Sequence, residues 1–187
     1  MKLLKKKMLV MLLLLLCGII NVQAENPTWY KLSHVEGINA IGFNGGTGWG
    51  NTFQVDIFHQ YYFHRKWSYL THLQYERGYF NLSGFNAINL MPSIEASVWN
   101  PTTWCHLHLT GDVILGWDFW NNSTIKSDVN GFALGANLGF NFEFLPTPEC
   151  SILVGAKQGW KYSWLNDNSD YNYFVPQFFV GVKYNIK

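Results

Sequence analysis

The chain has 187 residues and a formal net charge of +1, with 13% charged and 18% aromatic residues. Soluble domains usually carry about 25% charged residues, so the composition favours a protein with a large apolar surface. Thirteen basic residues against twelve acidic ones give an excess of only one positive charge, which argues against direct binding of nucleic acid.

The first 24 residues have the three parts of a secretory signal peptide. Four lysines within the first seven residues form the basic region, residues 8–20 form an apolar run, and residues 22–24 resemble a small-residue cleavage site. We therefore expect cleavage after Ala24, which leaves 25–187 as one domain with nine basic and twelve acidic residues, a net charge of −3. The alternative is a membrane anchor, but the apolar run is shorter than the ~20 residues that a spanning helix needs.

Eight segments of the remaining chain alternate between apolar and polar residues with a period of two, which predicts β-strands. The first alternates poorly, and 105–120 and 131–144 alternate most clearly, over a length well beyond the ~5–6 residues of ordinary strands. The predicted strands are residues 35–44, 52–63, 67–80, 89–98, 105–120, 131–144, 151–164 and 173–186.

The connections between these strands alternate in length. Longer polar loops are predicted at 45–50, 83–86, 121–130 and 166–170, with short turns between the other strands. Long loops on one side and short turns on the other are typical of outer-membrane barrels. The predicted fold is therefore all-β: an eight-stranded antiparallel up-and-down transmembrane β-barrel, preceded by a cleaved signal peptide. The alternative is a soluble lipocalin-like barrel, which would place charged residues outside.

Aromatic residues fall at both ends of the predicted outward faces, as the two girdles of a membrane barrel require. Phe132 and Phe144 are twelve residues apart, which gives about 28 Å of height at ~3.4 Å per residue and a ~45° tilt. Cys105 and Cys150 begin two strands with a third strand between them, so we expect no disulfide between them.

Charged residues of both signs are predicted to point into the barrel. An eight-stranded barrel is just wide enough to be filled by side chains, and an unpaired buried charge is costly. We therefore expect a paired polar network that plugs the interior, with a proton or ion path as the alternative. The predicted interior network consists of Asp56, Glu76, Glu95, Asp112, Glu143, Lys157, Lys161 and Lys183.

Two groups of residues are weak candidates for a chemical site. His106, His108 and Asp112 share an inward face, but two imidazoles without a clear third ligand are little evidence for a metal. Ser97, His72 and Glu76 supply the residue types of a lipid-modifying nucleophilic site, but no spacing requires them to meet. We expect no catalytic residues, no cofactor and no metal, and therefore no enzyme.

The C-terminal two thirds of the chain resemble the TraO family of conjugative-transposon outer-membrane proteins, and more generally small outer-membrane β-barrels. The resemblance rests on residues 94–96, 107–121, 135–145, 151–157 and 180–187. It implies a non-enzymatic structural or accessory component of a conjugative transfer apparatus, located in the outer-membrane bilayer alongside other transfer proteins. Two alternatives are an adhesin-like barrel that binds through its extracellular loops and a lipid-modifying outer-membrane enzyme.

Overall fold

The structure is a computed structural model that describes residues 34–48, 51–80, 83–102, 104–122, 127–166 and 170–186. The predicted signal peptide, residues 1–24, lies outside the described residues. Within the described residues, no helix is long and apolar enough to cross a membrane.

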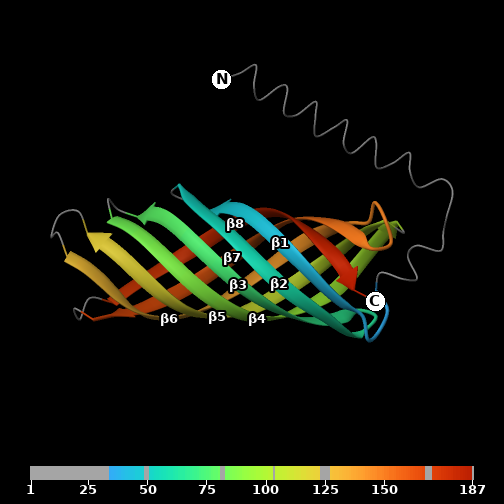
Figure 1. Cartoon of the computed structure of the whole chain (residues 1–187), viewed down its shortest axis with the longest axis horizontal. Coiled ribbons are helices and arrows are strands. Elements are labelled where there is room, and N and C mark those ends of the chain that lie inside the picture. The colour runs from blue at the N-terminus through green and yellow to red at the C-terminus, as the bar shows by residue number, and fades with distance from the viewer. Residues whose placement is uncertain are drawn as a thin grey trace, which may run out of the picture.

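The described residues form a closed barrel of eight antiparallel strands. Each strand pairs with its neighbours in sequence, and β1 closes the barrel against β8 (Figure 1). The predicted fold class, an all-β eight-stranded up-and-down barrel, is confirmed. The strands are β1 (Asn39–Gly48), β2 (Thr52–His64), β3 (Trp67–Phe80), β4 (Ser83–Thr102), β5 (Cys105–Asn122), β6 (Ser127–Phe144), β7 (Cys150–Leu165) and β8 (Asp170–Ile186).

The first strand begins and the last strand ends at the same end of the barrel. Asn39, the first residue of β1, pairs with Ile186, the last residue of β8, so both lie at one end, the terminal end (Figure 1). The turns after β2, β4 and β6 lie there too, because strand directions alternate. The opposite end, where β1, β3, β5 and β7 finish, is the distal end.

Several predicted loops are strands in the structure. Residues 45–48 belong to β1, 83–86 and 100–102 to β4, and 121–122 and 127–130 to β5 and β6. Alternating hydrophobicity stops at these positions, but the backbone ladder continues, as in the pairing of Asn121 with Asp128. The predicted contrast between long loops and short turns is therefore wrong.

The segment before β1 is a turn, although the sequence predicted strand from residue 35. Gly37 has a φ of 89°, a left-handed conformation that favours glycine. Its backbone N–H donates to the carbonyl of Tyr62 at 2.8 Å. This contact ties the turn to the terminal end of β2 and brings His34 into the barrel.

Side chains alternate between the lumen and the outside along every strand, as the pleat requires. Buried polar side chains fill much of the lumen, while large apolar side chains cover the outside. On β5, His108 is 1% exposed and its neighbour Leu109 is 51% exposed. This polarity is the reverse of a soluble barrel's, and it matches a lipid-facing wall.

Candidate functional site

Aromatic side chains with polar partners mark the distal edge of the outer apolar band. The Trp160 indole N–H donates to Asn172 Oδ1 at 2.5 Å, and the Tyr162 hydroxyl donates to Asp170 Oδ2 at 2.6 Å. On the other side of the barrel, the Tyr75 hydroxyl donates to an Asn86 oxygen at 2.8 Å. Rings with one apolar side and one hydrogen-bonding end suit the boundary between lipid and water.

The outer wall has an apolar depression of about 670 Å³ toward the terminal end. Residues of β1, β2, β3 and β8 line most of it, among them Ile41, Ile57, Leu73 and Val182. Its lining continues the apolar band, so acyl chains of a surrounding bilayer have the chemistry to fill it.

All eight residues of the predicted interior network lie in the lumen and are at most 8% exposed. The structure pairs the three lysines with three carboxylates: Lys157 with Asp112 at 2.7 Å, Lys161 with Asp118 at 2.5 Å, and Lys183 with Glu143 at 2.5 Å. Pairing of this kind is what buried charges require in a medium of low dielectric constant.

The Lys161–Asp118 pair forms a layer near the distal end. Asp118 also accepts hydrogen bonds from Ser163 and, at 3.0 Å, from the Tyr173 hydroxyl. The Lys161 ammonium donates a second hydrogen bond to Asn89 Oδ1 at 2.9 Å, and its charge also acts on buried Glu76.

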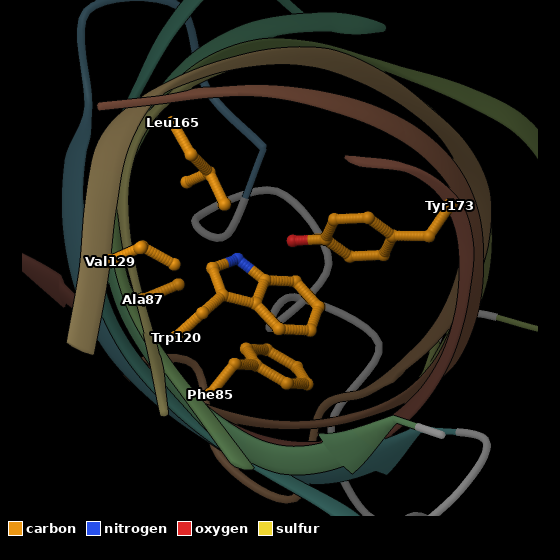
Figure 2. Close-up of a cluster of buried hydrophobic side chains, with 6 residues drawn as sticks. All are labelled: Phe85, Ala87, Trp120, Val129, Leu165 and Tyr173. Carbon is orange, nitrogen blue, oxygen red and sulfur yellow. The ribbon is translucent and has the colours of Figure 1, made fainter. Parts of the chain in front are cut away.

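An aromatic cluster closes the lumen beyond this layer. Figure 2 shows Trp120 lying across the interior, with Phe85 and Tyr173 reaching toward it from other parts of the wall. The Trp120 ring stacks on Phe85 with 5.0 Å between centroids and on Tyr171 with 4.7 Å. The buried members of the cluster are Phe85, Ala87, Trp120, Val129, Leu165 and Tyr173.

The middle of the lumen is also filled. Asp112 accepts hydrogen bonds from Lys157 at 2.7 Å and from the Asn137 amide at 3.4 Å, and Asp56 accepts one from the Asn44 amide at 2.8 Å. A cavity of about 20 Å³ lies between this layer and the terminal end, roughly the space of one water molecule.

A cluster of imidazoles and carboxylates occupies the terminal end of the lumen. His34 Nε2 lies 2.9 Å from Glu143 Oε2, and His108 Nε2 lies 3.0 Å from the same oxygen. The other carboxylate oxygen of Glu143 contacts the Lys183 ammonium at 2.5 Å. Lys183 also donates a hydrogen bond to the Tyr62 hydroxyl at 2.7 Å.

Glu95 lies behind His108 and is held in place from two sides. His108 Nδ1 is 3.4 Å from Glu95 Oε1. The amides of Gln60 and Asn141 each donate a hydrogen bond to the Glu95 carboxylate at 2.8 Å. The arrangement fixes the orientation of the His108 ring.

His34 enters this cluster from outside the strands. Burial lowers the pKa of its imidazole below the usual value, although the neighbouring Glu143 carboxylate raises it. The neutral imidazole is therefore favoured at this position.

The structure does not bring together the residues considered for a nucleophilic site. His72 of β3 pairs with Met91 of β4, and Glu76 pairs with Ala87. Ser97 lies six residues beyond Met91 along β4, or roughly 20 Å, and ten residues beyond Ala87, or roughly 34 Å. The Ser97 hydroxyl instead donates to Asn100 Oδ1 at 3.0 Å, and His72 faces Asp56 at 3.5 Å. Nor does Asp112 join His106 and His108, because it is bound to Lys157.

Both cysteines of the described residues are free. Cys105 pairs with Phe144 of β6, while Cys150 pairs with Tyr184 of β8. Strand β6 therefore separates them, as the sequence indicated.

Three participants in the interior network that the sequence-based list of charged residues left out are Asp118, Tyr62 and His34. Asp118 lies on the same inward face as Asp112, so the alternation alone was enough to include it. Tyr62 lies between aromatic residues that point outward, Tyr61 and Phe63. Only its position in the alternation indicates that its side chain points into the lumen. His34 precedes β1, where no periodic signal predicts its direction.

Comparisons with known proteins support the fold and give no family. No family model matches the chain, and no curated protein matches it. Neisserial surface protein A superposes with a TM-score of 0.56 at 13% identity, over 79% of this chain and 95% of that one. The N-terminal β-barrel domain of Pseudomonas aeruginosa OprF gives 0.54 at 12% identity, over 81% and 98%.

The attachment invasion locus protein Ail of Yersinia pestis is a third similar structure, with a TM-score of 0.50 at 16% identity over 81% of this chain and all (100%) of that one. At these identities the likeness concerns the fold alone. The chain has the fold of small outer-membrane β-barrels, and the comparisons do not show membership of the TraO family.

Proposed function

We propose that this chain is a non-enzymatic β-barrel of the outer membrane that serves as a structural or accessory component. The observation that carries the proposal is the inverted polarity: an apolar outer wall with aromatic edges surrounds a lumen of paired charges. A bilayer offers such a wall a better environment than water. The terminal end would then face the periplasm, as the two chain ends of an even-stranded barrel do.

Outer-membrane fractionation tests this proposal, combined with gel mobility of heated and unheated samples. We expect the protein in the outer-membrane fraction, with a mobility that changes on heating because the unheated barrel stays folded. A protein found in the soluble periplasmic fraction, with unchanged mobility, would overturn it.

The finer proposal is a role in conjugative transfer. It is supported by the resemblance of residues 94–96, 107–121, 135–145, 151–157 and 180–187 to the TraO family. The expected partners are other transfer proteins of the envelope. An affinity-tagged chain should co-purify with them, and its deletion should lower transfer frequency; normal transfer without the chain would contradict this role.

Surface binding is the second candidate, and the length of the strands favours it. Strand β5 has 18 residues, against the ~9–11 that span a bilayer. At ~3.4 Å per residue and a ~45° tilt it rises roughly 43 Å, beyond the ~25 Å apolar band. Polar residues such as Asn121 and Asn130 continue the wall at the distal end, where a ligand or host surface would make contact.

Replacing both with alanine should abolish binding of cells to a host surface if this candidate is correct.

A further inference from the structure

The terminal-end cluster has the composition and spacing of a metal site. His34, His108 and Glu143 each offer one ligand atom, and these three atoms lie within 4.8 Å of one another. Tetrahedral Zn²⁺ with bonds of ~2.0–2.2 Å places its ligand atoms about 3.3–3.5 Å apart. The 2.9 Å and 3.0 Å distances from Glu143 Oε2 to the two imidazole nitrogens therefore need only small side-chain adjustments to admit an ion.

The surroundings of His108 support metal binding independently. In protein metal sites, the second nitrogen of a ligating histidine usually donates to a carboxylate, which fixes the tautomer and makes the ligand more basic. Glu95 occupies this place, 3.4 Å from His108 Nδ1. A proton on Nδ1 directed at Glu95 leaves the lone pair of Nε2 facing Glu143 and His34.

The charged groups around the site are also compatible with a bound divalent cation. The cluster contains two carboxylates, Glu143 and Glu95, and one ammonium, that of Lys183, besides its imidazoles. Lys183 binds Glu143 Oε1, whereas both imidazoles face Oε2. An ion at Oε2 would therefore lie between the carboxylate and the two imidazoles and leave the Lys183 contact in place.

Access to the cluster is set by the turn before β1. His34 is 9% exposed, while His108 and Glu143 lie deeper at 1% and 0%. The His106 ring packs edge-on against His34 with 4.4 Å between centroids and supports it from the wall. An ion entering from the terminal end would meet His34 first and be held against the other two ligands.

We propose that His34, His108 and Glu143 bind one divalent transition-metal ion of the zinc class at the terminal end of the lumen, with a water molecule completing the coordination. Two nitrogens and one carboxylate oxygen form a ligand set that Zn²⁺ accepts. The site joins the turn before β1 to β5 and β6, so the ion would pin this turn inside the barrel.

Calorimetric titration of the full chain, folded in detergent micelles, with ZnCl₂ tests the proposal. We expect one Zn²⁺ per chain in the wild type and an affinity at least tenfold weaker in His34→Ala and in Glu143→Gln. The matched control is His59→Ala, because His59 lies on the outer wall and contacts Asn39 at 3.0 Å. This control should bind Zn²⁺ as the wild type does.

Folding is checked for each variant by heat-modifiable gel mobility. His34 lies outside the strands, so His34→Ala removes no strand residue and should keep the barrel folded. A second readout is the denaturant midpoint, which Zn²⁺ should raise in the wild type and not in folded His34→Ala. The proposal is overturned if the wild type binds no Zn²⁺, if folded His34→Ala binds with unchanged affinity, or if His59→Ala loses binding.

Discussion

Lys161 connects several polar groups of the distal layer. Its ammonium lies 2.5 Å from Asp118 Oδ1 and 2.9 Å from Asn89 Oδ1, and the side chain is 1% exposed. The charge on Asp118 is thereby compensated in a place that water does not reach. A buried pair of this kind adds little to the free energy of unfolding compared with an apolar pair of the same size. Removing only one member lowers that free energy strongly.

Lys161→Met should therefore lower the free energy of unfolding by about 3–5 kcal/mol, because Asp118 is left buried and unpaired. Denaturant unfolding in detergent, followed by tryptophan fluorescence, measures the loss. The control is Lys66→Met in the exposed turn after β2, which should change stability by less than about 0.5 kcal/mol. Equal effects of the two substitutions would contradict a structural role for the pair.

A double variant separates the pair from the lysine itself. Adding Asp118→Asn to Lys161→Met removes the orphaned charge and should recover part of the lost stability. A double variant that is less stable than Lys161→Met alone would indicate that Asp118 acts mainly through Ser163 and Tyr173.

At the residue scale, alternation was enough to predict which way the charged side chains of the strands point. It was not enough to predict partners. Lys183 and Glu143 lie on β8 and β6, which do not pair with each other, and their contact depends on how side chains cross the lumen. His34 was beyond prediction because a turn, rather than a strand, directs its side chain.

Strands β6 and β7 approach closely where glycine faces the lumen. A Cβ atom at Gly135 would collide with the Trp160 carbonyl and lie 3.0 Å from Lys161 Cα. The obstacle is backbone, which cannot rotate away. Gly111, on the outer face of β5, is different, since its Cβ would meet only Leu138 Cδ2 at 3.6 Å.

Gly135→Ala should destabilise the barrel by about 1–3 kcal/mol, the usual cost of overpacking, while Gly111→Ala should stay within about 0.5 kcal/mol of the wild type. The folded fraction of each variant, read from unheated gel mobility after refolding, gives a direct comparison. Comparable folded fractions for both variants would refute the idea that β6 and β7 need glycine to pack.

The errors in the predicted elements have one physical cause. Hydrophobic alternation reports contact with lipid, so it fades where a strand leaves the apolar band. Hydrogen bonding to neighbouring strands does not depend on lipid, and β4 therefore continues through Asn86 at one end and Asn100 at the other. In β1 four glycines among ten residues hide the alternation altogether.

At the scale of the whole molecule, the barrel wall separates an apolar outer surface from a polar lumen. Val113 lies near the middle of β5 on the outer face and is 48% exposed. Val113→Lys should destabilise the barrel in lipid vesicles by about 2–4 kcal/mol, because the charge would lie near the bilayer midplane. Reversible denaturant unfolding from the vesicles measures this difference.

Asn86→Lys is the matched control for that measurement. Asn86 is also on the outer wall but lies at the distal edge, beside the Tyr75 hydroxyl, where a lysine should cost about 0–1 kcal/mol. If both lysines cost the same, the outer band is not in contact with lipid.

The filled lumen predicts a barrel that does not conduct. The aromatic cluster around Trp120, the Lys161–Asp118 layer and the Lys183–Glu143 layer close it at successive depths. In planar bilayers the reconstituted protein should give no stepwise current, and Trp120→Gly alone should remain closed because the charged layers persist. Steady single-channel steps from the wild type would show that the interior rearranges.

The short length of β1 has a mechanical consequence for the barrel. Strands β5 and β6 are zipped together along 18 residues each, whereas β1 pairs with β2 and with β8 along only ten. A force pulling neighbouring strands apart would therefore separate β1 from a neighbour first. During assembly, the pairing of β1 would be the last to form. An opened seam exposes two unsatisfied strand edges, to which a strand of another protein is able to pair. If the closed barrel opens between β1 and β8, these two strands become its edges.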